Sequence, residues 1–165
     1  MTARFGVLVT LLLAGEASAQ LQSLQTNDLD LVYFGAEKYI TPHVARCFEN
    51  ALKHDRELFR WTPSERVTIF LNDFGDSGNA AATAVPADRI TVTNEAFSHD
   101  FEVILANERI NMIMNHELIH VIAVDKAAPR DITYRRFFGG KILPTSENPL
   151  SMFYSYLTTP RLYAP

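Results

Sequence analysis

The chain has 165 residues, of which 47% are hydrophobic and 21% charged, and its formal net charge at pH 7 is -4. This length suits one domain with its own hydrophobic core and leaves no room for several large domains. The charge balance is acidic and no basic block occurs. The sequence therefore argues against a nucleic acid or an anionic membrane surface as a partner.

Residues 1–19 have the pattern of a signal peptide. Arg4 gives a positive start, Phe5–Ala14 is apolar, and Ala17–Ala19 offers an A-x-A cleavage site before Gln20. The apolar stretch is shorter than the roughly 20 residues that span a membrane, and an uncleaved anchor is the alternative. We expect the mature protein to be exported, to the periplasm or the outside, with no membrane span after cleavage.

After the signal peptide, residues 20–165 are expected to form one domain. Three segments have the β-branched and aromatic content, or the alternation, that is typical of strands: Leu29–Phe34, Arg66–Leu71 and Asp88–Thr93. Residues 72–84 are rich in Gly, Asn, Asp and small residues, which predicts a loop.

A first helix is expected from Thr41–Pro42, with the threonine as N-cap, to Thr62–Pro63. Apolar residues recur in it at helical spacing and predict its buried face: Val44, Phe48, Ala51, Leu52, Leu58 and Phe59. Cys47 is the only cysteine and falls on this side, which predicts a buried, inert thiol. His43 and His54 fall on the polar side and are expected to be solvated.

A second, long helix is expected from near Asn107 to Asp125. It is apolar on nearly every side, so we expect it to be largely buried. A shorter helix should begin at Asn148–Pro149 and end at Thr159–Pro160. The sequence thus predicts an α+β fold: a small mixed β-sheet, a packed N-terminal helix and a buried second helix.

The second helix contains the pentapeptide H-E-x-x-H, formed by His116, Glu117 and His120. Residues four apart lie on one helix face, so both imidazoles would point to one place. Two neutral imidazoles suit Zn²⁺, and Glu117 could take a proton from a water molecule there. The alternative is a chance match, with both histidines hydrogen-bonded in the core.

A catalytic zinc normally has three protein ligands, and the third is not obvious here. Asp125 follows His120 by a turn and a half, off the face of the two histidines. Glu147 is farther along the chain but precedes a helix N-cap. Both are expected to be ordinary polar residues.

The pattern predicts zinc-assisted hydrolysis of a peptide bond. Glu117 would accept the proton of a water molecule and pass it to the leaving amine. We expect the segment Ile90–Thr93 to be a sheet edge that pairs with an extended peptide substrate. Tyr154, Tyr156 and Tyr163 could donate to an oxyanion, although aromatic packing is the alternative. Gly139–Lys141 lacks the full phosphate-loop pattern and predicts a turn.

Four segments together resemble a known family, and they are RVTIFLND (66–73), DFGDSGNAAATAVP (73–86), DRITV (88–92) and ANERINMIMNHELIHVIAVD (106–125). They are similar to the exported bacterial peptidase MA-like domains, on the gluzincin side of the HExxH zinc metallopeptidases. The resemblance covers most of the mature chain.

The resemblance implies a zincin-like fold, with His116 and His120 as zinc ligands and Glu117 as the catalytic base. In this family the third ligand is a glutamate on a later helix, within a W-x-x-E-G-like segment, and none occurs before Pro165. The chain is therefore expected to be a fragment, and some relatives carry a β-propeller afterwards. The alternative function is a non-catalytic, degenerate domain that binds peptides or a partner.

Overall fold

A computed structural model describes residues 20–73, 79–94 and 108–159 of the chain. These residues form an α+β fold with a mixed five-stranded sheet, as the sequence predicts. The strands are β1 (Leu21–Gln25), β2 (Leu29–Phe34), β3 (Val67–Asn72), β4 (Ala80–Thr83) and β5 (Arg89–Thr93). Their order across the sheet is β1-β2-β3-β5-β4. The central three strands are parallel, and the edge strands β1 and β4 are antiparallel to their neighbours.

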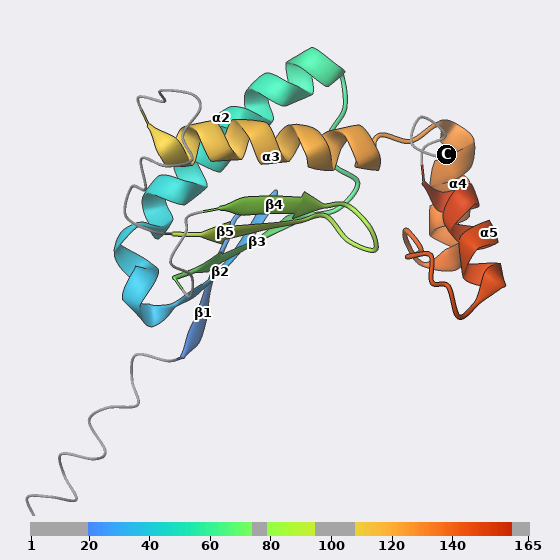
Figure 1. The fold of residues 1–165 in the computed structure, drawn as a ribbon. Coiled ribbons are helices and arrows are strands. Elements are labelled where there is room, and N and C mark those ends of the chain that lie inside the picture. The colour runs from blue at the N-terminus through green and yellow to red at the C-terminus, as the bar shows by residue number, and fades with distance from the viewer. Residues whose placement is uncertain (1–19, 74–78, 95–107, 160–165) are drawn as a thin grey trace, which may run out of the picture.

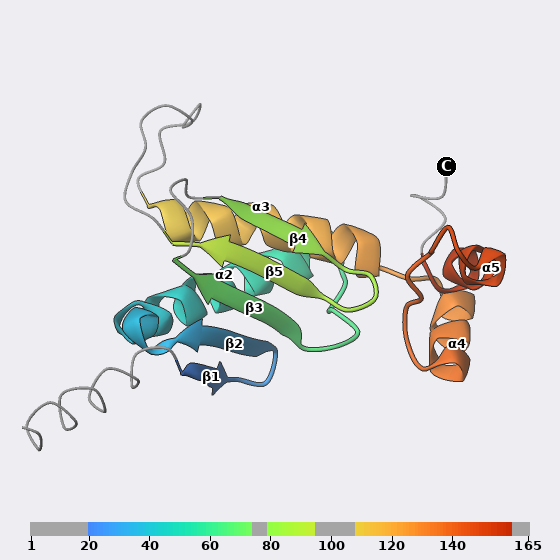
Figure 2. The ribbon, with the colours of Figure 1, turned by 60° about the horizontal axis from the view of Figure 1, so that its bottom comes forward.

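The helical elements are a short 3-10 helix η2 (Gly35–Tyr39), α2 (Thr41–Phe59), α3 (Arg109–Asp125), α4 (Pro129–Phe138) and α5 (Pro149–Thr158). Helices α2 and α3 lie side by side over one face of the sheet, whereas α4 and α5 lie beyond the C-terminal end of α3 (Figures 1 and 2). Among the described residues, no helix is long and apolar enough to cross a membrane.

The core lies between the sheet and the two covering helices. Leu31 in β2 is paired with Ile69 in β3, which is paired in turn with Ile90 in β5. Side chains in such a register share one face of the sheet, and all three are fully buried. Helix α2 contributes Val44, Phe48, Ala51 and Leu52 to the same cluster. Burying each large side chain contributes about 1.5–3 kcal/mol, so this layer fixes how α2 and α3 sit on the sheet.

The prediction of the sheet edge is wrong. Strand β5 contains Ile90–Thr93 and lies inside the sheet, between β3 and β4. The edge is β4, which falls within residues 72–84, the segment predicted to be a loop. Alanines have low strand propensity, so this short strand forms through its ladder with β5 rather than through its own residues.

Two details of the first helix also differ from the prediction. Its N-cap is Ile40, one residue earlier than expected, and Thr41 instead donates its hydroxyl to the carbonyl of Lys38. The helix ends at Phe59, because Arg60 adopts the left-handed conformation with φ of 48°. Leu58 was expected in the core but is 61% exposed on the last turn of the helix.

The end of α3 is held by a buried cluster of charges. Asp125 is fully buried, and its carboxylate accepts from Arg135 and Lys141 at 2.9 Å each. Lys141 also contacts Asp88 at 2.5 Å, just before β5. The Arg135 guanidinium donates as well to the Thr158 carbonyl at the end of α5. The cluster therefore joins α3, α4, α5 and the sheet.

Within this cluster one lysine faces two buried carboxylates. Burial, together with the nearby charge of Asp125, raises the pKa of Asp88 from its ordinary 3.8 to about 7, although Lys141 opposes this. Burial would also raise the pKa of Asp125, but Lys141 and hydrogen bonds from Ser64 and Trp61 outweigh it and lower the pKa. Asp88 is the carboxylate with the raised pKa because its second oxygen has no partner among the described residues, whereas the Asp125 carboxylate has several partners.

Asp88 should therefore stabilise the fold at acidic pH and not at alkaline pH. A pKa raised in the folded state contributes stability below its ordinary value, and the contribution is lost as pH rises through about 7. The difference in unfolding free energy between Asp88→Asn and the wild type should shift by about 1–3 kcal/mol in favour of the variant when the pH is raised from about 5 to about 8. Urea unfolding at both pH values measures this, and an unchanged difference would contradict it.

Candidate active site

Helix α3 carries the H-E-x-x-H pentapeptide. Its N-cap is Glu108, whose carboxylate accepts from the backbone N–H groups of Ile110 and Asn111 and so satisfies two otherwise unpaired donors. Buried apolar residues then recur every three or four positions and set the face that packs on the sheet and on α2: Ile110, Ile113, Met114, Leu118, Val121 and Ile122. The helix thus runs from Arg109 to Asp125, close to the predicted bounds.

The two histidines converge on the exposed side of this helix. The Nε2 atoms of His116 and His120 are 3.2 Å apart, and the two ring centroids are 4.9 Å apart. Two zinc–nitrogen bonds of about 2.05 Å to atoms at this separation would enclose an angle of about 103°, close to tetrahedral. Without a metal, the same distance suits one ring donating its N–H to the other. The pair thus has the spacing of two zinc ligands.

Helix α3 is largely buried, as expected, but one side of it is exposed. His116 and His120 are exposed, and Ile119 between them is 39% exposed. Among the described residues, α3 packs mainly on α2, β4 and β5, and these contacts leave the side of the two histidines open. Burial therefore does not force the histidines to find partners, and the alternative of hydrogen-bonded core histidines does not describe them.

Glu117 differs from both histidines because it is only 8% exposed. Within the described part of the chain, no hydrogen bond or ion pair engages its carboxylate. The Glu117 oxygens are not among the fully buried atoms without a partner, so the carboxylate reaches the surface although most of the residue is covered. Such a residue next to two converging imidazoles is the usual arrangement of a base kept free for a proton.

Neither expected third ligand joins the two histidines. All of the hydrogen-bonding capacity of Asp125 is directed at Trp61, Ser64, Arg135 and Lys141, at distances of 2.6–2.9 Å. Glu147 is exposed in the segment before α5. Among the residues that the structure describes, no third His, Cys, Asp or Glu lies close enough to complete a metal site with the pair. The described donors therefore fit zinc in type and spacing but supply two of its ligands.

The tyrosines named as possible oxyanion donors differ in their surroundings. Tyr154 packs its ring against Phe138, with centroids 4.8 Å apart, which agrees with aromatic packing. Tyr156 is 46% exposed on α5, and Tyr163 lies outside the described residues. Gly139 ends α4 in the left-handed conformation with φ of 80°, so the segment Gly139–Lys141 is the predicted turn.

Sequence reasoning missed a second group of possible ligands. His43 was expected to be solvated, but its imidazole lies 3.2 Å from the carboxylate of Glu108 and beside Cys47. Cys47 is buried, as predicted. The four-residue spacing of His43 and Cys47 was a readable signal, whereas Glu108 is 61 positions from Cys47 and its approach depends on how α2 packs against α3.

Comparison with known proteins identifies no relative. No family model matches the chain, and no curated protein or solved structure gives a significant match. The function proposed for the chain therefore depends on the residues and geometry of α3 and of its surroundings.

Proposed function

We propose that this chain carries the catalytic helix of a zinc-dependent peptidase that acts in an exported protein. His116 and His120 would hold the zinc ion, and Glu117 would be the general base. One observation carries the proposal: two imidazole nitrogens converge to 3.2 Å on the exposed side of α3, and the adjacent residue Glu117 has no partner among the described residues.

The chemistry divides between the metal and Glu117. Zinc bound to the two imidazoles would act as a Lewis acid that acidifies water and polarises a peptide carbonyl. Glu117 would accept a proton from the attacking water and deliver it to the departing amine nitrogen. These are the two proton transfers that peptide hydrolysis requires.

The substrate surface in this proposal is the open edge of β4. Among the described residues, this strand pairs with β5 alone, and it contacts α3 (Figure 1). An extended peptide can add to such an edge through main-chain hydrogen bonds, which tolerate many sequences. The side chains of Ala80–Ala82 on this strand are small. The edge strand β4 thus takes the role that the sequence assigned to β5.

A third ligand is required for a catalytic site, and it is not among the described residues. The resemblance to peptidase MA-like domains suggests a glutamate on a later helix. The proposal needs that ligand for turnover, but not for a first test of the histidine pair. Zinc held by two imidazoles alone should bind weakly yet measurably.

His116→Ala should weaken Zn²⁺ binding at this site by at least about 10-fold, because changes even outside the ligand set typically cost 10–100-fold. Equilibrium dialysis of the full-length protein measures the affinity, and cleavage of a labelled, unfolded protein measures turnover. Hydrolysis should stop on addition of a chelator and return with zinc.

The matched control is His54→Ala, which removes a histidine that is 69% exposed on α2. It should leave zinc affinity and hydrolysis unchanged. Equal zinc affinities of the His116→Ala and His54→Ala proteins would refute the assignment of the ligands. Hydrolysis that survives complete removal of zinc would refute the mechanism.

The second candidate is a non-catalytic module that binds extended peptides or a partner protein. It is favoured by the fact that the described residues supply only two ligands to the histidine pair. It predicts that Glu117→Gln leaves peptide affinity intact and that zinc gives no turnover. The peptidase proposal predicts the opposite result for turnover.

A further inference from the structure

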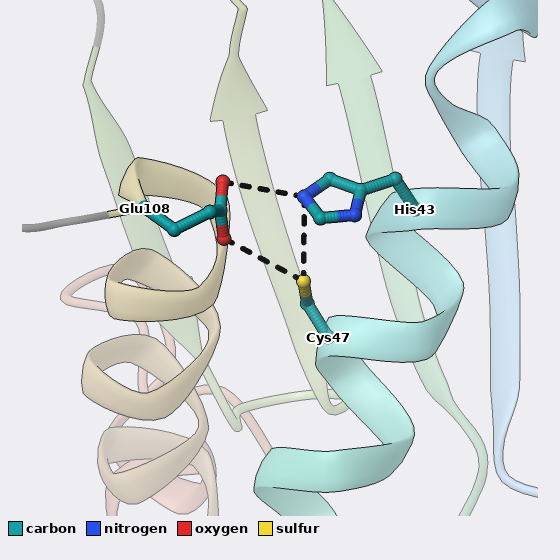
Figure 3. A group of neighbouring side chains, drawn as sticks. All are labelled: His43, Cys47 and Glu108. Atoms are coloured by element: carbon teal, nitrogen blue, oxygen red, sulfur yellow. Dashed lines mark hydrogen bonds and ion pairs between the residues drawn. The ribbon is translucent and has the colours of Figure 1, made fainter.

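A second group of metal-binding side chains lies where α2 meets the start of α3. His43 and Cys47 are four residues apart on α2 and project from one face, toward Glu108 at the N-cap of α3 (Figure 3). The His43 Nε2 atom is 3.2 Å from Glu108 Oε1 and 3.7 Å from Cys47 Sγ. The Cys47 Sγ atom is 3.7 Å from Glu108 Oε2.

These separations match those of ligands around one tetrahedral zinc ion. Zinc bonds of about 2.3 Å to sulfur and 2.0–2.2 Å to nitrogen or oxygen place a sulfur about 3.6 Å from the other ligand atoms. The same bond lengths place nitrogen and oxygen about 3.4 Å apart. The observed 3.7, 3.7 and 3.2 Å are of this size, with Oε1 of Glu108 facing His43 and Oε2 facing Cys47. Taking one ligand atom from each residue, all three lie within 4.8 Å of one another, so a small rotation of the carboxylate would complete the arrangement.

The type and exposure of the donors narrow the choice of ion. One sulfur, one imidazole nitrogen and one carboxylate oxygen suit a borderline-soft cation such as Zn²⁺, and they suit Mg²⁺ or Ca²⁺ poorly. The Cys47 side chain is 5% exposed, whereas those of His43 and Glu108 are 40% and 41% exposed. An ion could therefore arrive from the solvent side and keep a water molecule as its fourth ligand.

We propose that His43, Cys47 and Glu108 form a metal site that takes Zn²⁺ and links α2 to α3. The site is separate from the histidine pair. His116 follows Glu108 by eight residues, which corresponds to about 12 Å of helix rise. A metal here would hold the start of the helix that carries His116 and His120, so its role would be structural.

Without metal, the same atoms form hydrogen bonds. Burial raises the pKa of the Cys47 thiol to about 11, with Glu108 adding to the effect, and the thiol donates to the Glu108 carboxylate. Metal binding would form bonds from Sγ, Nε2 and a carboxylate oxygen, and the thiol proton would pass to solvent. Glu108 could continue to cap α3, because each carboxylate oxygen has a second lone pair.

Titration with Co²⁺ tests the proposal, because a thiolate bound to Co²⁺ gives a ligand-to-metal charge-transfer band in the near ultraviolet. Cys47 is the only cysteine in the chain, so the band would report on this site, and the histidine pair cannot produce it. We expect a band whose intensity corresponds to one thiolate per ion. We also expect it to persist in the His116→Ala/His120→Ala double variant.

His43→Ala and Glu108→Gln should each raise the Co²⁺ concentration at half-saturation by at least about 10-fold. His54→Ala, on the same helix, should leave it unchanged. His43 is partly exposed, so the His43→Ala protein should fold. It therefore tests the site even if Glu108→Gln weakens the N-cap and destabilises α3. Absence of the band at saturating Co²⁺, or a band unaffected by His43→Ala, would overturn the proposal. Two thiolates per ion would also overturn it, since Cys47 of two chains would then share the metal.

Discussion

Replacing Glu117 with glutamine should lower the rate of peptide hydrolysis by about 100- to 10,000-fold, the usual contribution of general acid–base catalysis. Glutamine has nearly the same shape but cannot accept and return a proton at neutral pH. Zinc binding at His116 and His120 should change little, because the carboxylate of Glu117 is not close enough to complete a metal site with them. Initial rates at saturating zinc measure the effect.

The control for this substitution is Glu57→Gln on α2, where the glutamate is exposed. It should retain the wild-type rate. Because Glu117 has no hydrogen bond or ion pair among the described residues, the nearly isosteric glutamine should fold as well as the wild type. A Glu117→Gln protein that hydrolyses peptides at the wild-type rate would remove Glu117 from the mechanism.

Asp125→Asn should lower the free energy of unfolding by about 3–5 kcal/mol, the range found when one partner of a buried ion pair is removed. The substitution leaves Lys141 and Arg135, both almost fully buried, facing an uncharged amide. One of the amide's atoms also becomes a donor, which opposes the donors of Trp61 and Ser64. Urea unfolding followed by circular dichroism measures the loss.

The matched control is Asp30→Asn, at a position in β2 where the carboxylate makes an exposed hydrogen bond with Gln25. It should cost less than about 1 kcal/mol, as for other exposed polar contacts. A loss at Asp125 no larger than at Asp30 would show that the buried cluster does not hold α4 and α5 onto α3. The zinc affinity of the histidine pair should be similar in both variants.

The parts of the fold that sequence predicted best have strong local patterns. The segment Leu29–Phe34 was predicted with its observed bounds because every second residue faces the core. In contrast, β1 was missed because it is an edge strand with no fully buried residue. The edge strand β4 was taken for loop because its alanines carry no strand signal. Helix α4 was not predicted, and its buried residues are the charged Asp131 and Arg135.

In the candidate site, too, local sequence predicted the residues within one helix but not the features that depend on packing between distant segments. The histidine pair and Glu117 could be found from sequence because all three lie within one turn and a half of a single helix. Burial of Glu117 but not of the histidines could not be found, since it depends on which side of α3 packs against the sheet. Likewise, the charged partners of Asp125 could not be read from the sequence, because Arg135 lies 10 and Lys141 16 residues later and both reach it only in the folded chain.

The most direct test of the proposed peptidase site is diffraction at the zinc absorption edge from zinc-soaked crystals. The account predicts an anomalous peak at about 2.0–2.1 Å from the Nε2 atoms of both His116 and His120, with Glu117 directed toward it. A map without such a peak, in which the two imidazoles hydrogen-bond to each other at saturating zinc, would contradict the account.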